Sequence, residues 1–105
     1  MQKIILTEKT VFVTGAAGFI GSNLVLELLR TQSPLKIVGI DNMNDYYDVS
    51  IKEWRLEEIE KCAAEHPESS WVFIRGSIAE RELIDQIFRD YRPAVVVNLA
   101  AQAGV

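Results

Sequence analysis

Three glycines and one aspartate form the pattern in this sequence that could do chemistry. Gly15, Gly18 and Gly21 stand three positions apart, between a short apolar run and an amphipathic stretch. Asp41 closes the next apolar run, twenty residues beyond Gly21. Glycines let backbone N–H groups approach a pyrophosphate, a helix N-terminus attracts the anion, and a carboxylate at this distance accepts hydrogen bonds from an adenosine ribose. The pattern predicts a dinucleotide-binding turn.

Each residue of the pattern has its own expected role. Gly15 should make the tight turn, Gly18 should let the backbone meet the pyrophosphate, and Gly21 should allow close packing of the helix on the sheet. Asp41 should repel a 2′-phosphate, so we expect NAD to be preferred over NADP. The alternatives are an ordinary strand-to-helix turn without a ligand, and an Asp41 that only begins the next loop.

The elements that must position these residues follow from the spacing of apolar residues. Apolar runs alternate with helical patterns, which is typical of repeated βα units around a parallel sheet. We expect strands at 10–14, 36–40, 71–75 and 94–99, and helices at 19–31 and 51–65. A third helix should follow a capping box from Ser77 to Glu80. Right-handed crossovers then predict an α/β, Rossmann-like sheet of strand order 3-2-1-4 with helices on both faces.

Side-chain patterns indicate which faces of these elements are buried. The second helix should turn four residues inward: Ile51, Trp54, Ile59 and Cys62. The third carries an apolar stripe: Leu83, Ile84, Ile87, Phe88 and Tyr91. The fourth strand would lie at an edge of the sheet, and we expect its apolar edge to favour self-association.

Composition narrows the class of protein. A chain of 105 residues is expected to be one domain, and a net charge of -4 without a basic cluster argues against nucleic acid or an anionic membrane as a partner. We expect the local positive field for a phosphate to come from a helix end. A lone Cys62 and the absence of a signal-peptide pattern favour a cytoplasmic protein, and the scattered acids, one Cys and one His lack metal-ligand spacing.

The glycine spacing resembles that of the extended short-chain dehydrogenase/reductase family of nucleotide-sugar enzymes. Residues 41–49, with Tyr46 and Tyr47, are similar to a loop of the UDP-glucuronate 4-epimerases, and residues 99–105 closely match the end of their fourth strand. The resemblance implies an NAD cofactor and a UDP-sugar substrate. It also implies that residues 1–105 are the NAD-binding Rossmann domain at the N-terminal end of a longer enzyme, cut after strand four.

Carried over to matching positions, the resemblance implies three groups of cofactor-binding residues. The group at the pyrophosphate is Gly15, Ala17, Gly18, Phe19, Ile20 and Gly21. The group at the adenosine is Asp41, Asn42 and Asn44 beside the ribose, with Ser77 and Ile78 beside the adenine. The group at the nicotinamide half is Leu99, Ala100 and Ala101, after which residues 102–105 would turn toward the substrate. The side chains of Phe19 and Ile20 should begin the helix core while their N–H groups face the phosphate.

Two positions depart from the family pattern. Ser77 stands where the family usually has an Asp that contacts the adenine amino group, and Asn98 stands where it commonly has His. We expect Ser77 to keep a helix cap and to weaken or lose the adenine contact.

The family's proton chemistry uses a Ser or Thr and a Tyr-x-x-x-Lys motif, and no tyrosine here is followed four positions later by lysine. We therefore expect no catalytic residue in this stretch, which should be inactive alone, with the catalytic residues beyond Val105. The resemblance implies that the parent is a nucleotide-sugar epimerase and a homodimer that interconverts UDP-glucuronate and UDP-galacturonate through a transient 4-keto sugar. The alternatives are another nucleotide-sugar 4-epimerase or 4,6-dehydratase, or a non-catalytic NAD-sensing module.

Overall fold

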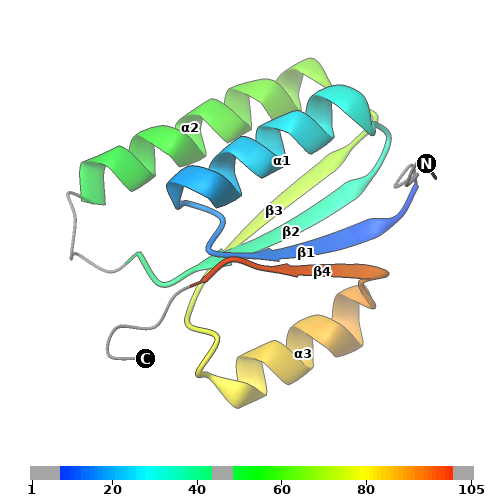
Figure 1. Cartoon of the computed structure of the whole chain (residues 1–105). Coiled ribbons are helices and arrows are strands. Elements are labelled where there is room, and N and C mark those ends of the chain that lie inside the picture. The colour runs from blue at the N-terminus through cyan, green and yellow to red at the C-terminus, as the bar shows by residue number, and fades with distance from the viewer. Residues whose placement is uncertain (1–7, 44–48, 101–105) are drawn as a thin grey trace, which may run out of the picture.

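The chain folds as a parallel sheet between two layers of helices. The computed structural model describes residues 8–43 and 49–100. In chain order the elements are β1 (Thr10–Thr14), α1 (Phe19–Thr31), β2 (Lys36–Asp41), α2 (Val49–Glu65), β3 (Ser70–Arg75), α3 (Arg81–Tyr91) and β4 (Val95–Asn98). All paired strands are parallel, in the order β3-β2-β1-β4. Helices α1 and α2 cover one face of the sheet and α3 covers the other (Figure 1), which confirms the predicted fold.

The centre of the sheet is apolar on both faces because helices cover both. Val11 and Val13 of β1 are fully buried in the cluster formed with α1 and α2. Phe12, between them, belongs to the opposite cluster. Its ring packs edge to face on that of Phe88, with 5.8 Å between the ring centroids. Alternate residues of one strand thus join the two halves of the core.

The carboxyl ends of the strands meet at one end of the sheet, on the left in Figure 1. Strand β2 is one residue longer than predicted, so Asp41 is its last residue, and α2 begins two residues earlier, at Val49. Helix α3 begins at Arg81, with Glu80 as its N-cap. The predicted helix cap at Ser77 is therefore wrong. The side chain of Glu80 does reach back to the amide of Ser77, at 3.0 Å, but this bond closes a turn that precedes the helix.

The predicted inner face of α2 is wrong in its first turns. Ile59 and Cys62 are buried as expected, but Ile51 is 46% and Trp54 is 58% exposed. The first turns of α2 lie against the polar strand ends rather than the apolar sheet, and Lys52 bonds there to the carboxylate that ends β2. Ile51 and Trp54 consequently line an outer groove between α1 and α2.

Candidate functional site

The glycine-rich turn is held against β2 by backbone hydrogen bonds. Gly15 has φ +71°, a conformation that favours glycine, as the predicted tight turn requires. The amides of Gly15 and Ala16 both donate to the carbonyl of Ile40, at 2.9 and 3.1 Å. The amide of Gly18 turns back to the carbonyl of Gly15 at 3.0 Å. The turn is therefore fixed before it reaches α1.

Gly21 allows α1 to start directly against this turn. A Cβ placed on Gly21 would lie 2.1 Å from the carbonyl oxygen of Gly15, which is a backbone atom without freedom to rotate away. Gly21 therefore allows a close approach, but to the backbone of the turn at Gly15 and Ala16 rather than to the sheet as predicted.

The N-terminus of α1 presents amides that precede the helical hydrogen-bond ladder. The first bond along the helix runs from the amide of Ser22 to the carbonyl of Gly18, at 2.9 Å. The N–H groups of Phe19, Ile20 and Gly21 therefore lie in the first turn, where a helix has no internal acceptor. The side chains of Phe19 and Ile20 are 68% and 66% exposed, so the expectation that they begin the core is wrong. Their place at the open strand ends, beyond the sheet, explains the difference.

Asp41 lies beside the turn as a buried carboxylate with three donors. Its Oδ2 accepts the amide of Ala17 at 3.0 Å, and its Oδ1 accepts the amide of Met43 at 2.8 Å and Nζ of Lys52 at 2.9 Å. A carboxylate has about four acceptor positions, and donors from the described residues fill three of them on Asp41. Asp41 is 6% exposed, and the three donors offset the cost of burying its charge.

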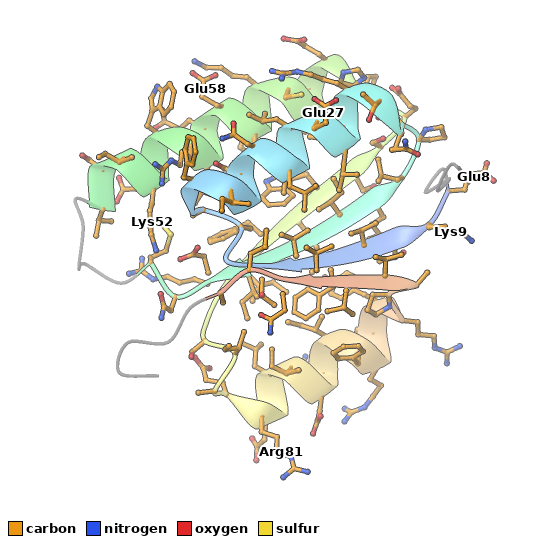
Figure 2. The ribbon with its side chains drawn as sticks, viewed as in Figure 1. Glu8, Lys9, Glu27, Lys52, Glu58 and Arg81 are labelled. Carbon is orange, nitrogen blue, oxygen red and sulfur yellow. The ribbon has the colours of Figure 1, made fainter. Side chains whose placement is uncertain are left out.

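Two cations of α2, Lys52 and Arg55, reach the turn and Asp41; both lie in the helix that resembles the family, but the sequence assigned neither a role at the site. Lys52 reaches from the start of α2 toward the end of β2 (Figure 2), and its side chain is 14% exposed. Nη1 of Arg55 donates to the carbonyl of Ala17 at 3.3 Å. The expectation that positive charge at the turn comes only from a helix end is therefore wrong. The available signal was the i,i+3 spacing of these cations on a helix that follows Asp41.

The end of β4 crosses over the turn. The hydroxyl of Thr14 donates to Oδ1 of Asn98 at 2.5 Å and accepts the amides of Leu99 and Ala100 at 2.9 and 3.1 Å. A Cβ on Gly15 would lie 2.9 Å from the amide nitrogen of Ala100. Leu99 and Ala100, predicted beside the nicotinamide half, therefore lie next to the glycine-rich turn, and Asn98 serves as the acceptor for Thr14.

The residues predicted beside the adenine follow β3 at the same strand ends. The amide of Gly76 donates to the backbone carbonyl of Asp41 at 3.0 Å, so Ser77 and Ile78 begin close to the end of β2. The hydroxyl of Ser77 accepts the amide of Ala79 at 3.1 Å within the turn. Asn42 is exposed directly after Asp41. Asn44, Ala101 and residues 102–105 lie outside the described residues.

A groove of about 480 Å³ lies along the outer surface between α1 and α2. Of the residues predicted to hold a cofactor, its lining includes only Phe19, beside others such as Leu26, Arg30 and Trp54. Arg55, which donates to Ala17 at the turn, also lines the groove, so the groove adjoins the strand ends through Arg55 and Phe19. In the part of the chain that the structure describes, helices fall short of the length and apolar character that crossing a membrane requires.

Known proteins share both the sequence and the fold. A UDP-glucuronate 4-epimerase of Thermodesulfobacterium geofontis is 39% identical over 93 residues, which are 89% of this chain and 26% of that protein. The chain thus spans about a quarter of this relative's length.

Two solved structures have the same arrangement. A dTDP-glucose 4,6-dehydratase of Bacillus anthracis in complex with NAD has a TM-score of 0.69 and 29% identity, with 90% of this chain and 27% of that chain covered. A UDP-glucose-4-epimerase of Stenotrophomonas maltophila with bound NAD and formylated UDP-arabinopyranose has a TM-score of 0.70 and 26% identity, with 93% and 26% covered.

The family comparison covers most of the chain. The model of the GDP-mannose 4,6 dehydratase family matches residues 12–105, from the middle of β1 onward. The matched stretch includes the glycine-rich turn, Asp41 and both cations of α2. The chain therefore belongs to the GDP-mannose 4,6 dehydratase family, within the short-chain dehydrogenase/reductase enzymes that its glycine spacing resembles.

Proposed function

We propose that residues 1–105 form the NAD-binding domain of a nucleotide-sugar epimerase of the UDP-glucuronate 4-epimerase kind. The observation that carries this proposal is the bond from the Ala17 amide to Oδ2 of Asp41, which joins the glycine-rich turn to a buried carboxylate. A dinucleotide needs groups for its pyrophosphate and for its adenosine ribose near each other, and this bond joins the turn to the carboxylate that would serve them. The two epimerases named above support the activity, and the two NAD-bound structures support the cofactor.

The polar groups at the turn fit the pyrophosphate of NAD. The amides of Phe19 and Ile20 precede the helical ladder and would bind the anion, while Gly18 lets the backbone come close. Gly15 and Gly21 would shape the turn, and Ala17 would link it to Asp41.

The groups around Asp41 fit the adenosine ribose. The carboxylate of Asp41 would accept one ribose hydroxyl, and the ammonium of Lys52, bonded to the same carboxylate, would donate to the other. Asn42 and Asn44 would extend this ribose site. Ser77 and Ile78 would lie beside the adenine, and Leu99, Ala100 and Ala101 beside the nicotinamide half. When bound, NAD supplies a hydride acceptor for the sugar.

A 4,6-dehydratase is the second candidate for the whole protein. The family description and the Bacillus anthracis structure both carry that activity in their names. The two activities share a cofactor and differ in their products, so the product formed by the full-length protein distinguishes them. An epimerised UDP-sugar supports our proposal, and loss of water with a 4-keto product supports the dehydratase.

Calorimetric titration of the chain with NAD and with NADP tests the cofactor. We expect NAD to bind more tightly, because Asp41 accepts a ribose hydroxyl and repels a 2′-phosphate. Asp41→Asn should weaken NAD binding by about tenfold, as expected for one hydrogen bond to a charged group. Glu57→Gln, which removes an exposed acid from α2, is the matched control and should leave the affinity unchanged. Equal affinity for NADP would contradict the assignment of Asp41, and a chain that binds neither dinucleotide would contradict the proposed function.

A further inference from the structure

We propose that Arg55 of α2 is a positioning residue for the glycine-rich turn, and that it orients the amides of α1 toward the cofactor. The inference rests on the proposed function where it concerns NAD. It begins from the carbonyl of Ala17, to which Nη1 of Arg55 donates a hydrogen bond at 3.3 Å. The guanidinium also lies over the ring of Phe19, with its central carbon 5.8 Å from the ring centroid. One side chain of α2 therefore contacts the last residue before the helix cap and the first residue of α1.

The backbone amide of Ala17, like its carbonyl, is bonded to a side chain from another element. Its amide donates to Asp41, whose carboxylate also accepts Lys52, three positions before Arg55 on α2. The contacts form a closed path that runs from α2 through Lys52 and Asp41 to Ala17, and back to α2 through Arg55. Because the path has two anchors on a seventeen-residue helix, movement of Ala17 requires at least one charged contact to break.

An external clamp of this kind replaces one that α1 lacks. Most helix N-termini are fixed by a side chain of the N-cap residue, which accepts an amide of the first turn. The N-cap of α1 is Gly18, which makes no side-chain bond to the helix. The direction in which α1 leaves the turn is instead set by contacts with other elements, and Arg55 supplies the contact that spans Ala17 and Phe19.

The same contact has an electrostatic consequence. Phe19 is 68% exposed, so its ring contributes little to the core and serves as a platform for the guanidinium. This places a permanent positive charge beside the first turn of α1 in a chain whose net charge is -4. An anion at the N-terminus of α1 would therefore meet both the helix dipole and Arg55.

Amide hydrogen exchange, followed by NMR on the chain without ligand, tests the positioning role. Arg55→Met keeps the aliphatic stem and removes the guanidinium, and we expect it to speed exchange at Ala17 and Gly18 by about three- to tenfold, which corresponds to one hydrogen bond. Exchange in the central strands β1 and β2 should not change. Arg55→Lys should recover part of the protection because it keeps a donor and a charge. Lys61→Met is the matched control, since Lys61 lies on the same helix and is 71% exposed.

Titration with NAD of the same variants separates this inference from the proposed function. Arg55→Met should weaken NAD binding by about three- to tenfold, while its thermal unfolding midpoint stays close to that of Lys61→Met. Unchanged exchange at Ala17 and Gly18 in Arg55→Met would overturn the positioning role, whatever the affinity for NAD. If exchange is faster in Arg55→Met and the wild-type chain fails to bind NAD, the role of Arg55 in the turn stands and the proposed function is refuted.

Discussion

Gly21 lies inside α1, where glycine is ordinarily less favourable than alanine by about 1 kcal/mol because its backbone loses more freedom on folding. The reason for its presence is steric. The position that a Cβ would take is 2.1 Å from the Gly15 oxygen and 3.1 Å from Cα of Ala16, and both are backbone atoms. Gly18 differs, because its Cβ would lie 3.2 Å from that oxygen and its φ is -73°.

Gly21→Ala should therefore destabilise the chain despite the better helix propensity of alanine. Overpacking against backbone costs about 1–3 kcal/mol, which exceeds the gain in propensity. Gly18→Ala should cost less than about 1 kcal/mol, since it only weakens an N-cap. Urea unfolding of both variants gives the two free energies of unfolding. An alanine at position 21 that leaves the urea midpoint unchanged would show that α1 does not start as close to the turn as described.

At the same scale, the sequence predicted residues whose roles depend on the backbone and missed those whose roles depend on long side chains. Gly15 and Asp41 follow from the spacing of a strand, a turn and a second strand, which is nearly fixed by geometry. The contacts of Lys52 and Arg55 depend on how α2 is rotated about its axis over the strand ends. A helical pattern rich in charged residues leaves that rotation open, because exposed cations and site cations look alike in sequence.

At the scale of elements, the strands and α1 were predicted closely because their apolar residues alternate or repeat with clear periods. Helix α2 was placed correctly but rotated wrongly in its first turns. Its apolar residues at 51 and 54 suggested burial, whereas Lys52 and Arg55 are the side chains that face the polar strand ends and bond there. The inner face of a helix is thus set by what it covers along its whole length, and a sequence pattern assumes that the covered surface is uniform.

Backbone pairing with β1 holds β4, and one hydroxyl holds the residues that follow it against the turn. Thr14 is 4% exposed, and its Oγ1 serves Asn98, Leu99 and Ala100 at once. The amide of Leu99 has a second acceptor, the backbone carbonyl of Thr14 at 3.2 Å, whereas the bond of Ala100 described here is to the hydroxyl. The two neighbouring amides therefore provide an internal comparison.

Thr14→Val should release the end of β4 while it preserves the shape of the buried side chain. We expect a loss of about 1–3 kcal/mol in the free energy of unfolding, because the substitution removes the hydroxyl that bonds to Asn98, Leu99 and Ala100. Amide exchange should accelerate more at Ala100 than at Leu99, since Leu99 keeps its backbone acceptor. Thr14→Ser retains the hydroxyl and is the control. Equal acceleration at both amides would indicate that β4 has separated from β1 and would contradict a local role for the hydroxyl.

At the scale of the whole molecule, β4 lies at one end of the sheet, and within residues 8–43 and 49–100 it pairs with β1 alone. Val96 of this strand is 46% exposed, and Phe88 and Leu99 are 43% and 37% exposed. An open strand edge with apolar neighbours is a template for pairing with another chain, whereas charged residues on an edge oppose such pairing.

The chain alone should therefore self-associate through β4, and Val96→Lys should suppress this. Sedimentation velocity at rising chain concentration should show an increasing sedimentation coefficient for the wild type and a nearly constant one for Val96→Lys. Val96→Thr keeps the branched shape without the charge, so it should behave much like the wild type and separate the effect of charge from that of altered packing. Because the net charge of -4 repels copies only weakly at ordinary salt, it should not prevent the association. A wild type that stays monomeric at high concentration would mean that neighbouring side chains already protect the edge of β4.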